Sequence, residues 1–116
     1  MVDKHKILYF KNAIFHDGIN YTVRMGDTWS KKVNKDDVIY IAKTGEKNLH
    51  GLPRVKIVDV FTCSYKDIPP WVLEHEHDPE CNHFDGLDKA MVEAYYDFLK
   101  PPYPFTLVTC IGFVMQ

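Results

Sequence analysis

The 116-residue sequence lacks several features that would place it in a broad class at once. No apolar run approaches the roughly 18 residues that are needed to span a bilayer, and residues 1–6 lack the apolar centre of a signal peptide. No glycine-rich phosphate loop joins a strand to a helix, so a P-loop or dinucleotide-binding fold is not expected. Internal repeats and low-complexity tracts are also missing. What is left is an ordinary globular composition, which predicts a single domain over residues 1–116.

Cysteine is scarce, with three residues at irregular spacing: Cys63, Cys81 and Cys110. An odd number of cysteines does not build a disulfide framework. Buried thiols in a reducing compartment explain them better, so the sequence predicts a cytoplasmic protein.

Charge of one sign is not in large excess, because the net charge is only −2. Tight, non-specific binding to long nucleic acid, which depends on many phosphate contacts, is therefore not expected. The charge is nevertheless uneven. Residues 31–66 contain eight Lys or Arg and four Asp or Glu, whereas residues 67–93 contain one Lys and eight Asp or Glu. The sequence thus predicts a basic face and an acidic face.

Hydrophobic periodicity predicts an α+β fold. Five segments read as strands, namely residues 6–10, 19–24, 38–42, 55–61 and 105–114. The third is apolar on both faces, which is typical of a central strand. A short helical turn is predicted at 68–73 and a longer helix at 86–99, capped by Asp85 and packed through Leu87, Met91 and Tyr95. The expected architecture is a small curved sheet or β-barrel of five to six mostly antiparallel strands with two or three helices.

The second predicted strand carries polar side chains on one face, Asn20, Thr22 and Arg24. A hydroxyl beside a planar guanidinium suits a pocket that orients a base carbonyl or holds a phosphate. The alternative is an exposed strand face on which Arg24 pairs with a surface carboxylate. If Arg24 lines a pocket, its replacement by alanine is expected to weaken ligand binding with little loss of stability.

Residues 73–83 pack three imidazoles, a thiol and four carboxylates into eleven positions. His75, His77, His83 and Cys81 are suitable zinc donors, but their spacing matches no common finger or ribbon pattern, and no metal is predicted. Glu80 is a candidate general base or hydrogen-bond acceptor, or else part of a solvated acidic loop. Cys81 could act as a nucleophile only with an activating imidazole at contact distance.

Three segments, taken in their order along the chain, resemble an ASCH domain of the PUA-like superfamily, in its phage or bacterial type. They are residues 21–29, residues 33–38 with Asp36 where glycine is usual, and residues 76–81 followed by Leu87, Met91, Tyr95 and a strand that ends Ile111-Gly112-Phe113. The resemblance spans about residues 19–114. It implies a small barrel with helices over its openings and a cleft suited to RNA or a modified nucleoside.

Some small members of that family are amidohydrolases on N4-acylated cytidine that use a lysine, a threonine and a glutamate. The resemblance places Thr22 at the threonine and Glu80 at the glutamate, while the lysine position falls near Ile19 or Asn20. Neither of these can serve as an amine base or nucleophile. The absence of a lysine at this position favours binding over hydrolysis.

Three functional hypotheses follow, none of which needs a cofactor. The favoured one is a domain that binds RNA or a modified nucleoside or nucleotide in a cleft near Thr22, Arg24, Trp29 and Lys31, with Trp29 stacking a base or plugging the barrel end. The second is a nucleoside amidohydrolase or ribonuclease acting through Thr22 and Glu80. The third is a viral protein-interaction domain that presents its acidic face to a protein partner.

Overall fold

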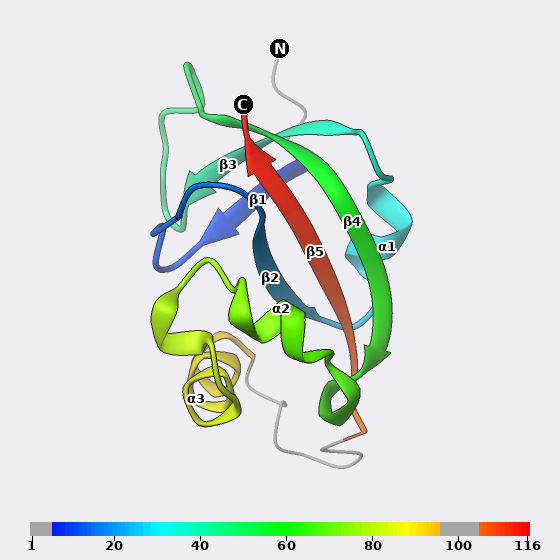
Figure 1. Ribbon diagram of the computed structural model, residues 1–116. Coiled ribbons are helices and arrows are strands. Elements are labelled where there is room, and N and C mark those ends of the chain that lie inside the picture. Colours follow the sequence, from blue (N-terminus) through cyan, green and yellow to red (C-terminus); the bar gives the residue numbers. More distant parts are fainter. Residues whose placement is uncertain (1–5, 96–104) are drawn as a thin grey trace.

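A computed structural model describes residues 6–95 and 105–116, and it shows an α+β fold around one curved sheet (Figure 1). The five strands are β1 (Ile7–Phe10), β2 (Asn20–Met25), β3 (Val38–Lys43), β4 (Arg54–Ser64) and β5 (Leu107–Met115). Their order across the sheet is β1-β3-β4-β5-β2. β1 and β3 run parallel, and the other three pairs are antiparallel. The predicted fold class and the central position of β3 are confirmed.

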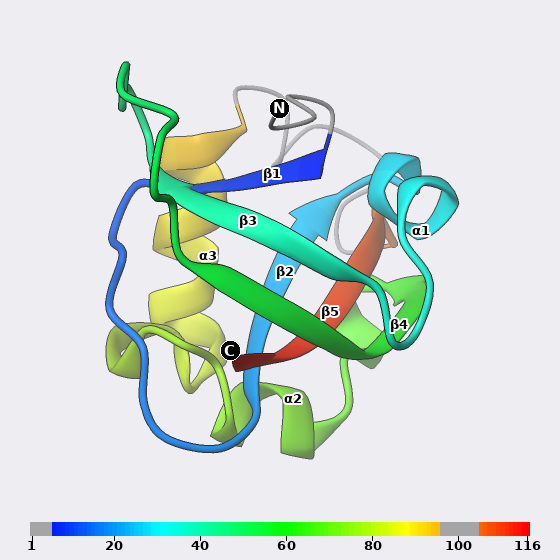
Figure 2. The ribbon, with the colours of Figure 1, turned by 90° about the horizontal axis from the view of Figure 1, so that it is seen from above.

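The sheet curves strongly without closing into a barrel. A register shift between Ile57 and Asp59 bends the long strand β4, as a bulge does. The curvature brings the two edge strands towards each other (Figure 2). No ladder joins β1 to β2 within the described residues, and a side chain makes the connection instead: Arg24 Nη1 donates to the carbonyl oxygen of Tyr9 at 2.8 Å.

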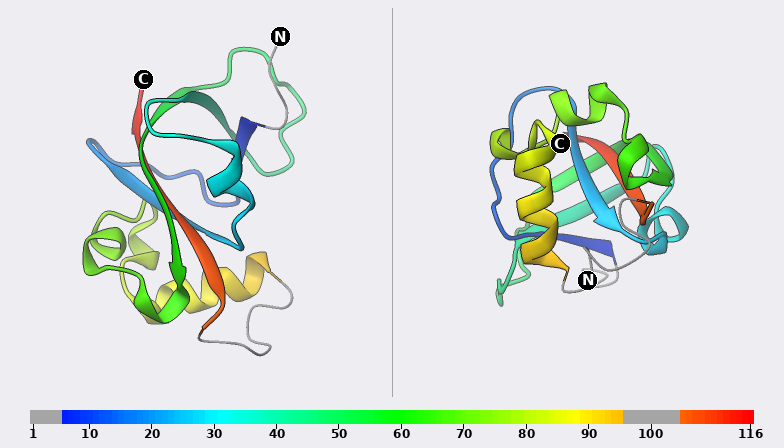
Figure 3. Two further views of the ribbon diagram at one scale, coloured as in Figure 1. Left: turned by 90° about the vertical axis from the view of Figure 1, so that its right-hand side faces the viewer. Right: turned by 90° about the horizontal axis from the view of Figure 1, so that it is seen from below.

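The helical elements are short. They are α1 (Thr28–Lys32), the 3-10 turn η2 (Tyr65–Asp67), α2 (Pro70–Glu74), the 3-10 turn η3 (Pro79–Cys81) and α3 (Phe84–Ala94). α2 and α3 lie on the same side of the sheet, while α1 lies away from α3, beside β4 (Figures 1 and 3). The turn predicted at 68–73 corresponds to α2, and α1 was not predicted.

The helix predicted at 86–99 begins earlier than expected, at Phe84. Its N-cap is His83, whose Nδ1 accepts a hydrogen bond from the Gly86 N–H, so the prediction of Asp85 as the cap is wrong. A histidine nitrogen with a free lone pair satisfies the same orphan donor as a carboxylate would. Tyr95 is already extended, and residues 96–99 lie outside the described part of the chain.

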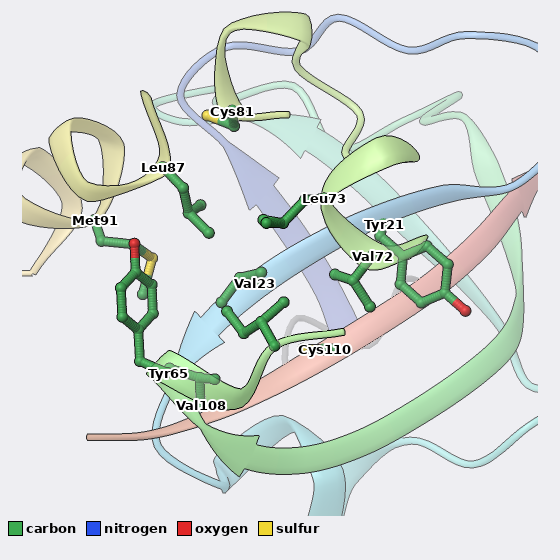
Figure 4. Packing of buried hydrophobic residues seen from close by; sticks show 11 residues of the cluster. Tyr21, Val23, Tyr65, Val72, Leu73, Cys81, Leu87, Met91, Val108 and Cys110 are labelled. Atoms are coloured by element: carbon green, nitrogen blue, oxygen red, sulfur yellow. The ribbon is translucent and has the colours of Figure 1, made fainter. Parts of the chain in front are cut away.

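Two apolar clusters lie on opposite faces of the sheet. The first fills the space between β2, β5 and the helices (Figure 4); it includes Leu87 and Met91, with Tyr95 partly buried against it, as predicted. The second lies inside the curve of the sheet and consists of Leu8, Phe10, Val33, Ile39, Ile41, Val55, Ile57, Ile111 and Phe113. No helix among the described residues is long and apolar enough to cross a membrane.

Candidate functional site

The polar face of β2 points into the molecule. Asn20 is fully buried and Thr22 is 4% exposed, because the face lies inside the curve of the sheet. The Asn20 side chain holds the backbone of His16: its Nδ2 donates to His16 O at 2.8 Å, and its Oδ1 accepts from His16 N at 3.0 Å. Thr22 lies opposite Ile111 of β5.

Arg24 places a positive charge at the open side of the sheet. Its guanidinium carbon lies 4.7 Å from the centre of the Phe10 ring, and Nη1 is bonded to Tyr9 O. Nε is buried and has no hydrogen-bond partner. Burial lowers the pKa of Arg24, whereas Tyr95 and Glu76 oppose the shift. The guanidinium nevertheless stays charged at neutral pH, since its ordinary pKa exceeds 12.

Glu76 places a buried carboxyl group near that charge. The residue follows α2 and forms an isolated parallel bridge with Tyr21, beside the free edge of β2. It is 5% exposed, and its Oε2 has no partner. Burial raises the pKa of Glu76 well above 4.5, while a backbone hydrogen bond from Asp78 and the charge of Arg24 oppose the shift. No ion pair within 4 Å joins Arg24 to Glu76 among the contacts of the described residues.

His77 shares a proton with Glu76. Its Nδ1 lies 2.9 Å from the carbonyl oxygen of Ile14, which can only accept, so Nδ1 carries a hydrogen. Its Nε2 lies 3.1 Å from Glu76 Oε1. That contact needs one proton, carried either by the carboxyl group or by the ring, because two lone pairs at this distance repel. Burial lowers the pKa of His77.

We call Arg24, Glu76 and His77 the buried charged cluster: Glu76 and His77 are buried, and Arg24 is half-buried with its Nε out of contact with solvent. It combines a fixed positive charge, a proton held between two residues, one free donor at Arg24 Nε and one free acceptor at Glu76 Oε2. Buried polar atoms are rarely left unpaired, because each costs about 1–3 kcal/mol. Chemically, the cluster can bind a small polar group that offers both an acceptor and a donor.

The other predicted site residues lie apart from this cluster. Glu80, in η3, is exposed, and its backbone N–H donates a hydrogen bond to Asp78 Oδ1. Trp29 is half-buried against the inner apolar cluster, with Lys32 Nζ 4.8 Å from its ring centre. Lys31 is exposed and pairs with Asp27 at 3.2 Å.

The histidines and Cys81 do not converge. His75 Nδ1 contacts Trp71 O, and His83 caps α3. No group of three or more His, Cys, Asp or Glu that could hold a metal is present in the described ranges. Burial and the neighbouring carboxylates raise the pKa of the Cys81 thiol to about 12, so Cys81 is not a thiolate at neutral pH.

Sequence reasoning did not single out Glu76. It is one of four carboxylates in residues 73–83. Because this segment is neither a full strand nor a helix, the spacing of its residues does not predict which of the four is buried. One signal was available: Glu76 begins the short motif at 76–81 that resembles the family pattern.

Comparisons with known proteins bear on the fold. No protein-family model matches the sequence, and no curated protein shows significant similarity to it. The structure is similar to the crystal structure of an ASCH domain from Lactobacillus crispatus JV V101, with a TM-score of 0.60 and 10% identity. The match covers 83% of this chain and 63% of that one. The chain therefore has the fold of an ASCH domain, as the sequence motifs predicted.

Proposed function

We propose that this domain binds RNA or a modified nucleoside, and that the buried charged cluster is the centre of its binding site. One observation carries the proposal: Arg24 Nε and Glu76 Oε2 are a donor and an acceptor that are both buried and both unpaired. The edges of heterocyclic bases offer complementary acceptors and donors in one plane, and a guanidinium is well suited to bind them.

The ASCH fold is consistent with this proposal, and so is the charge of the site. The pair formed by Glu76 and His77 holds one proton and is neutral overall, so Arg24 contributes a net positive charge that attracts phosphate or polar carbonyl groups. Thr22 faces the same interior side of β2 as Arg24 and adds a hydroxyl. Trp29 and Lys31 lie apart from the cluster on α1, which follows β2 in the chain, and would extend the proposed surface in that direction.

The experiment is a titration of isotope-labelled protein with cytidine, N4-acetylcytidine and a short single-stranded RNA, followed by NMR. We expect shifts centred on Arg24, Glu76 and His77. Arg24→Lys keeps the charge but removes Nε, and it is expected to weaken binding about tenfold, the effect of one lost charge-assisted hydrogen bond.

Arg54→Lys is the matched control, because it makes the same chemical change at an exposed strand position. Binding is expected to be unaltered in this variant. If all three probes fail to bind, or if both variants weaken binding equally, the cluster is not the binding site.

A hydrolase is the second candidate, and the elevated pKa of Glu76 favours it, because a carboxyl group that titrates nearer neutrality is a better general base. Thr22 would supply the hydroxyl. Glu80 is exposed whereas Thr22 is buried, so an enzyme of this kind would use Glu76 in its place. With Ile19 and Asn20 at the lysine position, we expect little or no hydrolysis of N4-acetylcytidine.

The assay is release of acetate from N4-acetylcytidine. Turnover on the order of 1 per second or faster, abolished by Thr22→Ala and by Glu76→Gln but not by Glu80→Gln, would establish the enzyme and replace the binding proposal.

A further inference from the structure

The loop that joins β1 to β2, residues 11–19, lies over part of the buried charged cluster. Figure 2 shows it running along the outside of the segment that joins α2 to α3. The side chains of this β1–β2 loop are exposed, apart from the half-buried Phe15. The loop has no regular secondary structure of its own.

Three hydrogen bonds fasten the loop to residues 75–78, and each depends on a side chain. Asn12 Nδ2 donates to Asp78 Oδ2 at 2.7 Å. His77 Nδ1 donates to Ile14 O at 2.9 Å, and His16 Nε2 donates to His75 O at 3.2 Å. No backbone-to-backbone hydrogen bond joins these two segments in the described part of the chain. The loop is therefore attached far less firmly than the strands are to one another.

Phe15 seats the loop on the site. Its ring centre lies 5.1 Å from that of Phe10, 5.4 Å from that of His77 and 5.9 Å from that of Phe113. Phe10 also packs against the guanidinium of Arg24. The single apolar anchor of the loop thus touches residues that hold the cluster in place.

The loop lies against His77, and His77 Nε2 lies 3.1 Å from Glu76 Oε1. Glu76 Oε2 is inaccessible to solvent, so a segment that covers this pair has to move before a ligand can reach it. We propose that residues 11–19 form a lid, which detaches from residues 75–78 and lets a polar ligand reach Glu76 and His77. The role of the lid in ligand entry rests on the proposed function, whereas its opening does not. Segments held by few contacts open locally at far lower cost than the whole fold, and such lids commonly control access to a site.

Hydrogen exchange tests the opening without any ligand. The Tyr21 N–H is bonded to His75 O at 2.7 Å and the His77 N–H to Tyr21 O at 2.9 Å, beneath the loop. In Asn12→Ala and in Phe15→Ala, we expect these two amides to exchange about tenfold faster, as for loss of one anchoring contact. Amides of the ladder between β4 and β5 should keep their rates.

Ile68→Ala is the control for general loosening, because Ile68 lies in the other apolar cluster. It should accelerate all slow amides together. If the lid variants leave the Tyr21 and His77 amides unchanged, or accelerate them only as much as the ladder amides, the loop is not a lid.

A reversible lock tests the role of the lid. Asn12→Cys combined with Asp78→Cys puts one thiol on each side of the contact between the two side chains. A bifunctional methanethiosulfonate reagent can join these thiols across a gap too wide for a direct disulfide, and reduction releases it. Cytidine is the probe, and the cross-linked and reduced forms of this one variant are compared. We expect the cross-linked form to bind at least tenfold more slowly than the reduced form, as for a closed gate; equal rates would overturn the gating role. If neither form binds cytidine, but the Tyr21 and His77 amides exchange faster in Asn12→Ala and Phe15→Ala as expected, the lid is supported and the cytidine site is refuted.

Discussion

Glu76 is a carboxyl group removed from water, and its neighbours decide how it titrates. Burial raises the pKa of Glu76 well above 4.5 and lowers the pKa of His77 below 6.5. Between these ordinary values the two effects on stability cancel, because the unfolded chain keeps one proton on histidine while the folded pair also keeps one. Above pH 6.5 the unfolded chain loses its proton, whereas the folded contact between His77 Nε2 and Glu76 Oε1 requires one. The free energy of unfolding is therefore expected to fall as the pH rises further.

Glu76→Gln removes the titrating carboxyl group, and its amide can still donate to His77 Nε2. The free energy of unfolding of this variant, relative to the native protein, is expected to increase with pH above 4.5, with a slope of at most about 1.4 kcal/mol per pH unit. Denaturant unfolding at a series of pH values measures it. Glu80→Gln, at an exposed position, is the control. A difference that does not vary with pH would show that Glu76 titrates as it does in water.

Asp36 is a second residue whose environment is unusual, because it has a φ of +77°. This left-handed conformation suits glycine, the residue usual at this position in the resembled family, and aspartate tolerates it better than most residues. Two backbone hydrogen bonds to Ile57 hold the turn. The Asp36 N–H donates to Ile57 O at 2.7 Å, and the Ile57 N–H donates to Asp37 O at 2.8 Å.

Asp36→Val is expected to lower the free energy of unfolding by about 1–2 kcal/mol, because a β-branched side chain clashes with the backbone in this conformation. Asp36→Gly should leave it nearly unchanged, since relief of strain offsets the added freedom of the unfolded chain. Chemical denaturation of both variants checks this. Equal losses would mean that the aspartate side chain, and not the backbone, stabilises the turn.

At the scale of elements, α3 is set by its junction with η3. A Cβ at Gly86 would lie 1.6 Å from the carbonyl oxygen of Glu80, so the first turn of α3 packs directly on the backbone of η3. This close approach positions the segment that carries Glu76 and His77 relative to the helix.

Gly86→Ala separates local preference from packing. Helix propensity alone predicts a gain of about 1 kcal/mol, whereas the clash predicts a net loss of about 2–3 kcal/mol, as for overpacking. Thermal and denaturant unfolding decide between these signs. Lys89→Ala, at an exposed position of the same helix, is the control and should change little. A stabilised Gly86→Ala would mean that η3 shifts easily.

At the scale of the whole molecule, Arg24 connects the two free edges of the sheet. Its bond to Tyr9 O is the recorded link from β2 to β1, and its charge favours the ionised form of Glu76. The sequence predicted that losing Arg24 would affect binding with little effect on stability. The structure changes that expectation, because the side chain is also part of the fold.

Arg24→Met keeps the length and apolar stem of the side chain. It is expected to lower the free energy of unfolding by about 2–3 kcal/mol, because Tyr9 O loses its donor and Glu76 loses the nearby cation. Hydrogen exchange should show β1 and β3 loosening before β4 and β5. Arg54→Met is the control at an exposed position, and equal stability of the two variants would refute a structural role for Arg24.

The class of fold, the five strands, α2 and the packing stripe of α3 could all be predicted from the sequence, because they depend on periodicity within short segments. The residues that share a face of β2 could also be predicted, since alternation in a strand is local. The inward direction of this face could not, because curvature of the sheet and the coverage of both its faces depend on contacts between distant segments. The same holds for the choice of Glu76 among four neighbouring carboxylates: burial beside Tyr21 and proximity to Arg24 arise from the bridge between the α2–η3 segment and β2, which no pattern in residues 73–83 records.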